Sequence, residues 1–254
     1  MALPIAIQLY TVRDAMAADF VGTIQKIADF GYAGVEGAGV VYQHTPPKEA
    51  AKLFKDLGLT VMGAHETLPL GDDKNAVLDR MGIMETKKLI CPWRPPEKFK
   101  SVDSIKAICE ELNAADVVAR ENGLSLLYHN HWFEYETLDG KPVNQIMQEN
   151  LAPTVGLEID TYWVKVGGQN PAQVVKDAGS RAPLLHIKDG PASSIEANMV
   201  AVGDGVMDWD AIIGAGQGST EWLIVELDRC STDMLEAVGK SYTYLTGKGF
   251  ARGR

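Results

Sequence analysis

The chain has 254 residues, a formal net charge of −10 at pH 7 and a sequence pI near 5.0. This acidic balance argues against sequence-independent nucleic-acid binding, which depends on basic patches that neutralise phosphates. The 46% apolar share is enough for a substantial core, yet no apolar run approaches the roughly 18 residues that a membrane span requires.

The N-terminus and the cysteines indicate the cellular compartment in which the protein is expected. The first residues lack a basic region and enter an apparent strand by Ile5, so we expect no signal peptide. Cys91, Cys109 and Cys230 are far apart, odd in number and without a CxxC spacing, which favours reduced thiols over a disulfide or a metal site. We therefore predict a cytoplasmic enzyme.

Short apolar runs that end in polar side chains predict eight strands. The clearest begins at Leu126, is rich in leucine and leads into His129, Asn130 and His131. On a strand, a two-residue spacing would point His129 and His131 to the same side. In chain order the predicted strands are Ile5–Leu9, Gly34–Glu36, Thr60–His65, Lys88–Cys91, the run from Leu126, Thr154–Asp160, Pro183–Asp189 and Trp222–Asp228.

Helical spacing of apolar residues alternates with these strands. In the first predicted helix Val21, Ile24, Ile27 and Ala28 share a face, and Gly31 follows its end, as a glycine commonly does. The predicted helices are Phe20–Phe30, a helix that starts at Pro46 and Pro47 and stops at Gly58, Asn75–Met84, Ser101–Arg120, Val143–Glu149, Pro171–Ala178, Trp209–Ala215 and Thr232–Leu245.

This alternation implies parallel strands joined by crossover helices, in a closed barrel or in an open doubly wound sheet. Nearly every strand carries a polar residue at its C-terminal end. In a barrel all of those ends meet on one face, whereas an open sheet needs such residues only beside its switch point. Since no change in composition marks a boundary, we predict an α/β protein with one (β/α)8 TIM-barrel domain over residues 1–254.

Four strand ends in the second half of the chain carry side chains that can bind a metal. We predict that His129, Asp160, His186 and Glu226 bind one divalent ion. Imidazole and carboxylate together accept Mn, Co, Zn, Fe or Mg, and the mixture does not select among them. Any one of these residues alone is more often a hydrogen-bonded or helix-capping residue, so the prediction depends on the joint pattern.

Carboxylates and a lysine near these ends are candidates for proton transfer. The predicted catalytic residues are Glu226, Glu158, Glu134 and Lys188. Glu158 lies two residues before Asp160 and shares its face, so a role as ligand, as base or as a partner that orients a ligand stays open. Ordinary loop charges are the alternative for Glu134 and Lys188.

Other side chains near the strand ends are predicted to form the substrate pocket. Flat aromatic surfaces suit the C–H faces of a sugar, although a core position is an equal alternative for the tryptophans. The candidate substrate-binding residues are His65, Trp93, His131, Trp163 and Gln8.

Several motifs, in this order and spacing, resemble a known family. They are Ile7-Gln-Leu-Tyr-Thr-Val-Arg13, Gly31-Tyr-Ala-Gly-Val-Glu36, Leu157-Glu-Ile-Asp-Thr-Tyr-Trp163, Leu185-His-Ile-Lys-Asp189, Val202-Gly-Asp-Gly205 with Asp208-Trp209, and Ile224-Val-Glu226. Over essentially its whole length the chain resembles the sugar phosphate isomerase/epimerase superfamily, the xylose isomerase-like TIM barrels.

The resemblance implies a metal site built by Glu, Asp, His and Glu, of which Asp160, His186 and Glu226 match the last three. The first position differs, because this chain has His129-Asn130-His131 where many relatives have Glu-Asn-His. The ketose epimerases in the family use the first and last Glu as a paired acid and base, and that pair is lost here. An inosose dehydratase-like branch also has a histidine-rich strand, so elimination competes with epimerisation.

The chemistry implied by the resemblance is proton removal next to a carbonyl, with a metal-stabilised enediolate. We expect a sugar isomerase or epimerase. The alternatives are a lyase acting on an inosose or a 3-keto-glycoside, a zinc-dependent DNA endonuclease and a non-catalytic sugar-binding barrel. The expected partner is a small sugar, keto-sugar or inositol, with no nucleic acid and no membrane, and a homo-oligomer stays open.

The loop Gly203-Asp204-Gly205 bears on whether the substrate carries a phosphate. Barrel phosphate sites usually use backbone amides after the seventh and eighth strands. This loop places a carboxylate in that region, and the sequence has no glycine-rich basic loop there. We therefore expect a substrate without a phosphate.

Overall fold

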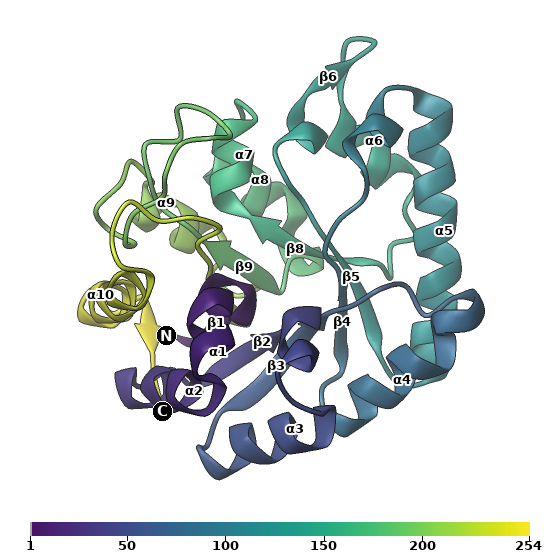
Figure 1. Ribbon diagram of the computed structural model, residues 1–254. Helices are drawn as coiled ribbons and strands as arrows, with labels where there is room; N and C mark the ends of the chain where they lie inside the picture. The colour runs from purple at the N-terminus through teal and green to yellow at the C-terminus, as the bar shows by residue number, and fades with distance from the viewer. Residues whose placement is uncertain (1) are drawn as a thin grey trace.

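A computed structural model describes residues 2–254, in which parallel strands form a closed barrel surrounded by helices (Figure 1). The strands pair in the order β10, β9, β8, β5, β4, β3, β2, β1, and pairing of β10 with β1 closes the ring. The barrel strands are β1 (Leu3–Gln8), β2 (Gly34–Gly37), β3 (Thr60–His65), β4 (Lys88–Cys91), β5 (Ser125–His129), β8 (Gly156–Asp160), β9 (Leu184–Ile187) and β10 (Trp222–Val225). The predicted (β/α)8 barrel is confirmed.

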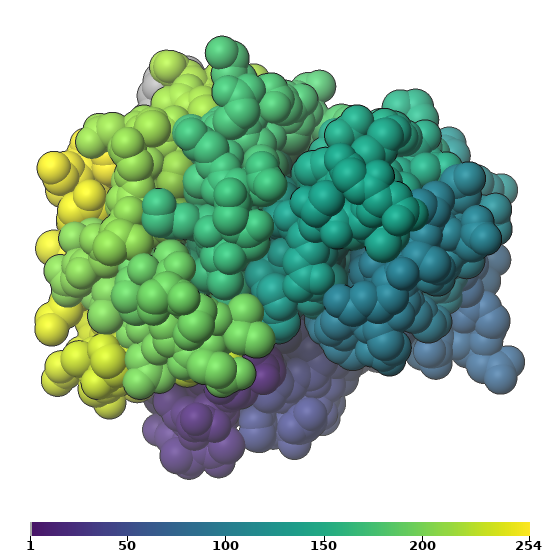
Figure 2. All heavy atoms as spheres, turned by 90° about the horizontal axis from the view of Figure 1, so that it is seen from above, coloured from purple at the N-terminus to yellow at the C-terminus, as the bar shows by residue number. Residues whose placement is uncertain are grey.

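Helices cover the outside of the barrel between successive strands (Figure 1). They are α1 (Arg13–Ala18), α2 (Phe20–Phe30), α3 (Pro47–Asp56), α4 (Lys74–Ile83), α5 (Val102–Glu121), α6 (Val143–Asn150), α7 (Thr161–Val166), α8 (Pro171–Ala178), α9 (Trp209–Ala215) and α10 (Met234–Gly247). Seen from above, the middle of the chain (blue to teal) and its last third (light green to yellow) lie on opposite sides of the molecule (Figure 2). No helix within residues 2–254 is long and apolar enough to cross a membrane.

Local signals explain where these helices begin and end. Asp19 accepts a hydrogen bond from the backbone of Gly22 at the start of α2, and Gly31 ends this helix with a φ of 101°. All eight predicted helices are present, each within about two residues of its predicted bounds. The sequence patterns missed α1 and α7, because a helix of six residues is too short to show a helical period.

Two short elements lie outside the ring of barrel strands. A two-stranded hairpin, β6 (Thr137–Leu138) with β7 (Lys141–Pro142), follows β5, and β11 (Ala251–Arg252) pairs with the start of β1. The sequence patterns predicted neither, because two residues are too few to show the alternation of a strand. Neither element contributes a residue to the predicted site.

A small apolar layer closes the barrel interior. It consists of Ala6, Met62, Ile90, Leu127, Leu184 and Ile224. Since side chains on a strand alternate, the next inward residue lies two positions later and one layer higher. Gln8, His129, His186 and Glu226 follow Ala6, Leu127, Leu184 and Ile224 at this spacing. The polar layer therefore lies directly above an apolar floor.

The β2–β3 pair departs from this regular spacing. The register shifts between Val35 and Glu36, so that Glu36 pairs with Gly63. A Cβ at Gly63 would lie 2.7 Å from Ile90 Cδ1 and 3.5 Å from Glu36 Oε1. Glycine at this position leaves the space that the Ile90 side chain fills, next to the Glu36 carboxylate.

One carboxylate, Asp189, organises the long loop after β9. It accepts hydrogen bonds from the backbone N–H groups of Gly190, Gly203 and Met207 and from the indole N–H of Trp209, at 2.9 to 3.2 Å. Asp189 is fully buried. A side chain that satisfies four donors at once holds both ends of the loop to the barrel, which accounts for the spacing of the Asp189, Gly203 and Trp209 motifs.

We expect Asp189→Ala to lower the free energy of unfolding by about 3 kcal/mol or more, because it leaves several buried donors unsatisfied. Asp189→Asn keeps one carbonyl oxygen and should cost less. Urea denaturation of the two variants and the wild type measures the difference. Equal midpoints for all three proteins would contradict this role of Asp189.

Candidate active site

Polar side chains from six barrel strands converge above the apolar floor. Apart from His65, which is partly buried, each is at most 4% exposed. They are Glu36, His65, His129, Glu158, Asp160, His186, Lys188 and Glu226. Two groups of these residues place metal-capable atoms within 4.8 Å of one another, and the two groups share His129 and His186.

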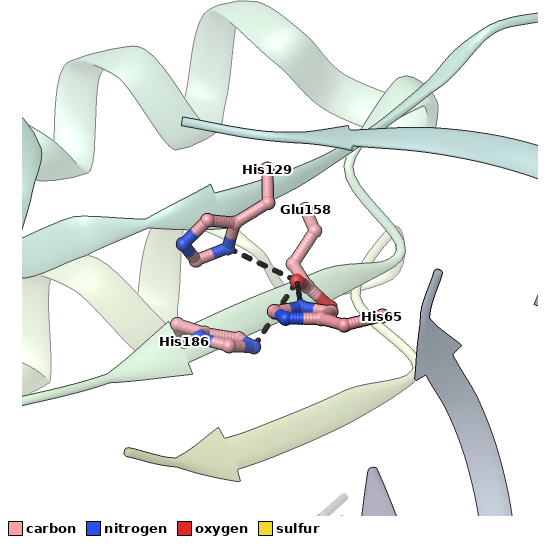
Figure 3. Close-up of side chains that lie close together, drawn as sticks. All are labelled: His65, His129, Glu158 and His186. Atoms are coloured by element: carbon pink, nitrogen blue, oxygen red, sulfur yellow. Dashed lines mark hydrogen bonds and ion pairs between the residues drawn. The ribbon is translucent and has the colours of Figure 1, made fainter. Parts of the chain in front are cut away.

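We call the first group, His65, His129, Glu158 and His186, the inner cluster. Figure 3 shows its three imidazole rings converging on one oxygen of Glu158. Glu158 Oε2 lies 2.8 Å from His65 Nε2, 3.0 Å from His129 Nδ1 and 3.1 Å from His186 Nε2. Three imidazole nitrogens and a carboxylate oxygen thus surround one small volume.

Glu36 brings a second carboxylate to the same imidazoles. Its Oε2 atom lies 2.8 Å from His186 Nε2 and 3.3 Å from His65 Nε2. Gln8 Nε2 donates a hydrogen bond of 2.7 Å to that oxygen and so holds the carboxylate in place. Gln8, predicted to bind substrate, is fully buried and contacts Glu36 instead of lining the cavity.

The second group, His129, Asp160, His186 and Glu226, is the predicted ligand set, and we call it the outer cluster. His186 Nδ1 lies 2.7 Å from Glu226 Oε2, whereas His129 Nε2 is 3.8 Å from Asp160 Oδ2. The structure thus brings all four predicted ligands together.

The ammonium group of Lys188 lies among the outer carboxylates. Lys188 Nζ is 2.9 Å from Asp160 Oδ2, 2.8 Å from Glu226 Oε2 and 2.7 Å from Asp228 Oδ2. Lys188 is 1% exposed, and a buried ammonium requires such partners. It therefore neutralises part of the negative charge of the outer cluster.

Burial and neighbouring charges divide the carboxylates into two kinds. Burial and the nearby Glu158 raise the pKa of Glu36 to about 7. Burial also acts to raise the pKa of Glu158, but His186 and His65 hold it well below its ordinary value. One proton is thus favoured on Glu36 while Glu158 stays ionised.

The imidazoles differ in the same way. Burial, with the positive charge of His186 nearby, lowers the pKa of His129 to about 3. Burial also acts to lower the pKa of His186, yet Glu158, Glu226 and Glu36 carry it well above its ordinary value. His186 therefore carries the charge that these carboxylates require.

The outer carboxylates are kept ionised chiefly by the lysine. Burial acts to lower the pKa of Lys188, but Asp160, Asp228 and Glu226 hold it well above its ordinary range. Burial acts to raise the pKa of Glu226, and Lys188 and His186 hold it well below. For Asp160, burial prevails over Lys188 and raises the pKa to about 6. Glu226 is thus an ionised carboxylate at neutral pH.

A cavity of about 730 Å³ opens over these residues. His65, His129, Lys188 and Glu226 belong to its lining, so both clusters reach the cavity. Tyr10, Arg13, Trp93, His131 and Asp228 also line it, and the residues Tyr10 and Trp93 are 43% and 47% exposed. A volume of this size accommodates a sugar with aromatic surface at its mouth.

Two predicted site residues, Glu134 and Trp163, are engaged elsewhere, whereas the predicted His131 does reach the cavity. Glu134 is buried beside a separate cavity of about 30 Å³, where it accepts hydrogen bonds from Tyr128 Oη at 2.6 Å and from the backbone N–H of His131 at 2.9 Å. Trp163 is buried, with its ring 5.4 Å from Lys188 Nζ, and does not belong to the cavity lining. His131 follows the end of β5, stacks on Phe133 and reaches the cavity.

Sequence patterns left Glu36, Asp228, Tyr10 and Arg13 out of the candidate site. Glu36 ends a strand of the predicted series and Asp228 lies two residues after Glu226, so the strand-end rule could have found both. Tyr10 and Arg13 lie in the first turns after β1, where no short-range pattern marks them.

The chemistry of the inner donor set fits a divalent ion. Imidazole nitrogens and carboxylate oxygens are common ligands of Zn, Mn, Co and Fe. Glu36 Oε1 and Glu158 Oε1 are buried without a hydrogen-bond partner, and a buried carboxylate oxygen of this kind needs a cation or a donor. These residues can hold a metal ion.

Comparison with models of known protein families assigns the chain to a family. Residues 24–238 match the family model described as the xylose isomerase-like TIM barrel. The chain belongs to this family. No curated protein matches it.

Solved structures share the fold of this xylose isomerase-like barrel. A sugar phosphate isomerase/epimerase from Parabacteroides distasonis ATCC 8503 matches with a TM-score of 0.84 at 22% identity, over 99% of this chain and 96% of its own. The probable 3-DHS dehydratase AsbF from Bacillus anthracis matches with a TM-score of 0.75 at 13% identity, over 96% and 99%. A structure of L-ribulose 3-epimerase matches with a TM-score of 0.68 at 15% identity, over 98% and 95%.

The buried Glu134 gives the barrel a specific pH dependence. Burial raises its pKa from 4.5 to about 7. Between these values the folded state holds a proton that the unfolded state has released, so stability falls as pH rises through this window, by about 3 kcal/mol in total. Glu134→Gln imitates the protonated carboxyl, and we expect it to exceed the wild type in stability at pH 8 and to lose this advantage near pH 4.5.

The measurement is the difference in unfolding free energy between Glu134→Gln and the wild type, from urea denaturation at several pH values between 4 and 8. Glu136→Gln, at a neighbouring exposed position, is the matched control. A difference for Glu134→Gln that does not grow with pH would contradict the prediction.

Proposed function

We propose that this chain is a divalent-metal-dependent sugar isomerase or epimerase that removes a proton next to a carbonyl. The observation that carries the proposal is the convergence of a metal-competent group of imidazoles and carboxylates with Lys188 and Glu226 on one cavity of about 730 Å³. The printed names of two structural neighbours, an isomerase/epimerase and an L-ribulose 3-epimerase, support the same reaction class.

The bound divalent ion would supply Lewis-acid polarisation of the substrate carbonyl. Glu226 lies in the cavity lining, stays ionised and can accept the adjacent proton. Lys188 places an ammonium 2.8 Å from that carboxylate, where it stabilises negative charge on a substrate oxygen. His65 and His129 line the same cavity and bring metal-capable imidazoles next to the bound substrate.

The basic residues that line the cavity support a substrate without a phosphate. Lys188 is engaged by Asp160, Glu226 and Asp228. The two terminal nitrogens of Arg13 donate hydrogen bonds to the backbone oxygens of Tyr10 and Asp228. Within residues 2–254, the lysine of this lining is neutralised by carboxylates and each terminal nitrogen of its arginine already donates one hydrogen bond, which favours a neutral keto sugar or keto-inositol over a phosphate ester.

A lyase is the second candidate. The histidine at position 129 stands where a carboxylate would pair with Glu226 across the substrate, so the chain lacks the paired carboxylates of an epimerase and keeps a single base at Glu226. A structural neighbour is named as a probable 3-DHS dehydratase. Elimination would use the same proton abstraction but would end with loss of the hydroxyl.

The proposal is tested on protein stripped with a chelator and reloaded with Mn, Co, Zn, Fe or Mg. Incubation with keto sugars and inososes in deuterium oxide, followed by nuclear magnetic resonance, should show deuterium at the carbon next to the carbonyl and an epimerised or isomerised product. A conjugated carbonyl with new ultraviolet absorbance would favour the lyase. No exchange in any loaded form, with any of these substrates, would contradict both reactions.

We expect Glu226→Gln to lower kcat by about 10²- to 10⁴-fold, since the amide cannot accept the proton. Glu221→Gln is the matched control, because Glu221 precedes β10 at the opposite end of the same strand and pairs with Lys88 on the surface. Steady-state rates of the exchange reaction give the comparison. Equal losses in the two variants would argue against Glu226 as the base.

A further inference from the structure

We infer that the divalent ion binds the inner cluster, flanked by Glu36, and that Asp160 and Glu226 of the outer cluster hold Lys188 and orient the ligand histidines instead of binding the ion. The inference rests on the metal dependence in the proposed function and assigns that ion a position. It departs from the ligand set that the family resemblance implies.

The spacing of the inner atoms is that of ligands around one ion. A metal with ligands at about 2.1 Å holds adjacent ligand atoms about 3.0 Å apart in an octahedral shell and about 3.4 Å apart in a tetrahedral shell. The contacts that Glu158 Oε2 and Glu36 Oε2 make with the imidazole nitrogens of His65, His129 and His186 run from 2.8 to 3.3 Å. These contacts therefore have the lengths that neighbouring ligands of one ion show.

The two shared histidines point different nitrogens at the two clusters. His186 Nε2 faces Glu158 and Glu36, while its Nδ1 is 2.7 Å from Glu226 Oε2. Histidine ligands commonly donate their second N–H to a carboxylate, which fixes the ring and strengthens it as a ligand. Glu226 is placed to accept this hydrogen bond when an ion binds at Nε2.

Charge separates the two clusters further. Within residues 2–254, the inner carboxylates Glu36 and Glu158 form ion pairs with histidines alone, and a histidine gives up its proton when it binds a metal. One oxygen of each, like Asp160 Oδ2 of the outer cluster, is buried without a hydrogen bond. A divalent ion with neutral imidazoles balances these two charges. The outer oxygens of Asp160 and Glu226 already have the Lys188 ammonium within 2.9 Å, and this positive charge repels a metal ion at the same place.

The donor set also predicts metal preference. Three imidazoles with carboxylate oxygens favour Zn, Co or Fe over Mg, whose preferred ligands are oxygens. His65 and His129 line the cavity, so an ion bound between them is accessible to a substrate oxygen. Lys188 and Glu226 belong to the same cavity lining, so the ion pair that they form faces a substrate bound at this ion.

The number of coordinated imidazoles distinguishes the two positions. The inner cluster contains His65, His129 and His186, whereas the outer cluster contains only the two shared histidines. X-ray absorption spectroscopy of the zinc-loaded wild type should therefore show three imidazole ligands. His65→Ala should reduce the count to two, because His65 belongs to the inner cluster alone. The number of imidazole ligands in the wild type is measured without any variant, so the test remains valid even when His65→Ala fails to fold.

The affinity for zinc provides a second measurement, in which each carboxylate is replaced by the amide of the same shape. Titration of the metal-free protein with Zn²⁺ should show that Glu158→Gln weakens binding by 1,000-fold or more, while Asp160→Asn weakens it by roughly 10- to 100-fold, as expected for a residue that supports a ligand. Substitutions at His129 and His186 do not discriminate, because both clusters use these rings. Circular dichroism of the variants controls for folding.

Two imidazoles in the wild type, a count unchanged by His65→Ala, or a larger loss of affinity in Asp160→Asn than in Glu158→Gln would overturn the inner position. A protein that binds zinc through three imidazoles but exchanges no deuterium would support the inner position of the metal ion and contradict the proposed reaction. Failure of the wild type to bind any divalent ion would overturn both.

Discussion

Charge buried inside a barrel must be neutralised where it lies, and the arrangement of this site follows from that constraint. The apolar layer that includes Leu127 and Ile224 closes the interior from below, so solvent reaches the polar layer only from the cavity side. Every carboxylate above that floor therefore has a protein partner. Imidazoles surround Glu158, and an ammonium group lies beside Glu226. The inner cluster thus neutralises its carboxylate with imidazoles, whereas the outer cluster uses the ammonium group.

The shared imidazoles couple these two halves. A histidine ring is rigid, so a hydrogen bond at one nitrogen determines how the other nitrogen points. His186 joins Glu158 on one side to Glu226 on the other, and its position on β9 is fixed by the register in which His186 pairs with Asp160 of β8 and Ile224 of β10. A cation on the inner side leaves an N–H for Glu226 and favours its ionised form. Occupancy of the inner cluster and the basicity of the cavity carboxylate are thus linked through one ring.

The sequence was sufficient for the barrel, because eight strand–helix alternations with polar strand ends have few other solutions. It also identified most side chains of the site, since the rule of polar strand ends requires no knowledge of packing. It could not distinguish the inner cluster from the outer, which depends on the nitrogen that each ring presents. The role of Glu134 was equally hidden, because only the fold shows that Tyr128 and the backbone of His131 occupy both of its oxygens.

Asp160 illustrates why a residue that matches a family motif can have a different role in this chain. Its Oδ1 atom accepts a hydrogen bond of 2.9 Å from the backbone N–H of Trp163 and caps α7, and its Oδ2 atom lies 2.9 Å from Lys188 Nζ. Oδ1 is therefore used by the helix, and Oδ2, which has no hydrogen bond, lies against the ammonium. Glu158, two residues earlier on the same strand, carries neither obligation and reaches the three imidazoles. An ion at the proposed inner position would thus be bound by a carboxylate two residues earlier on this strand, with Lys188 beside Asp160.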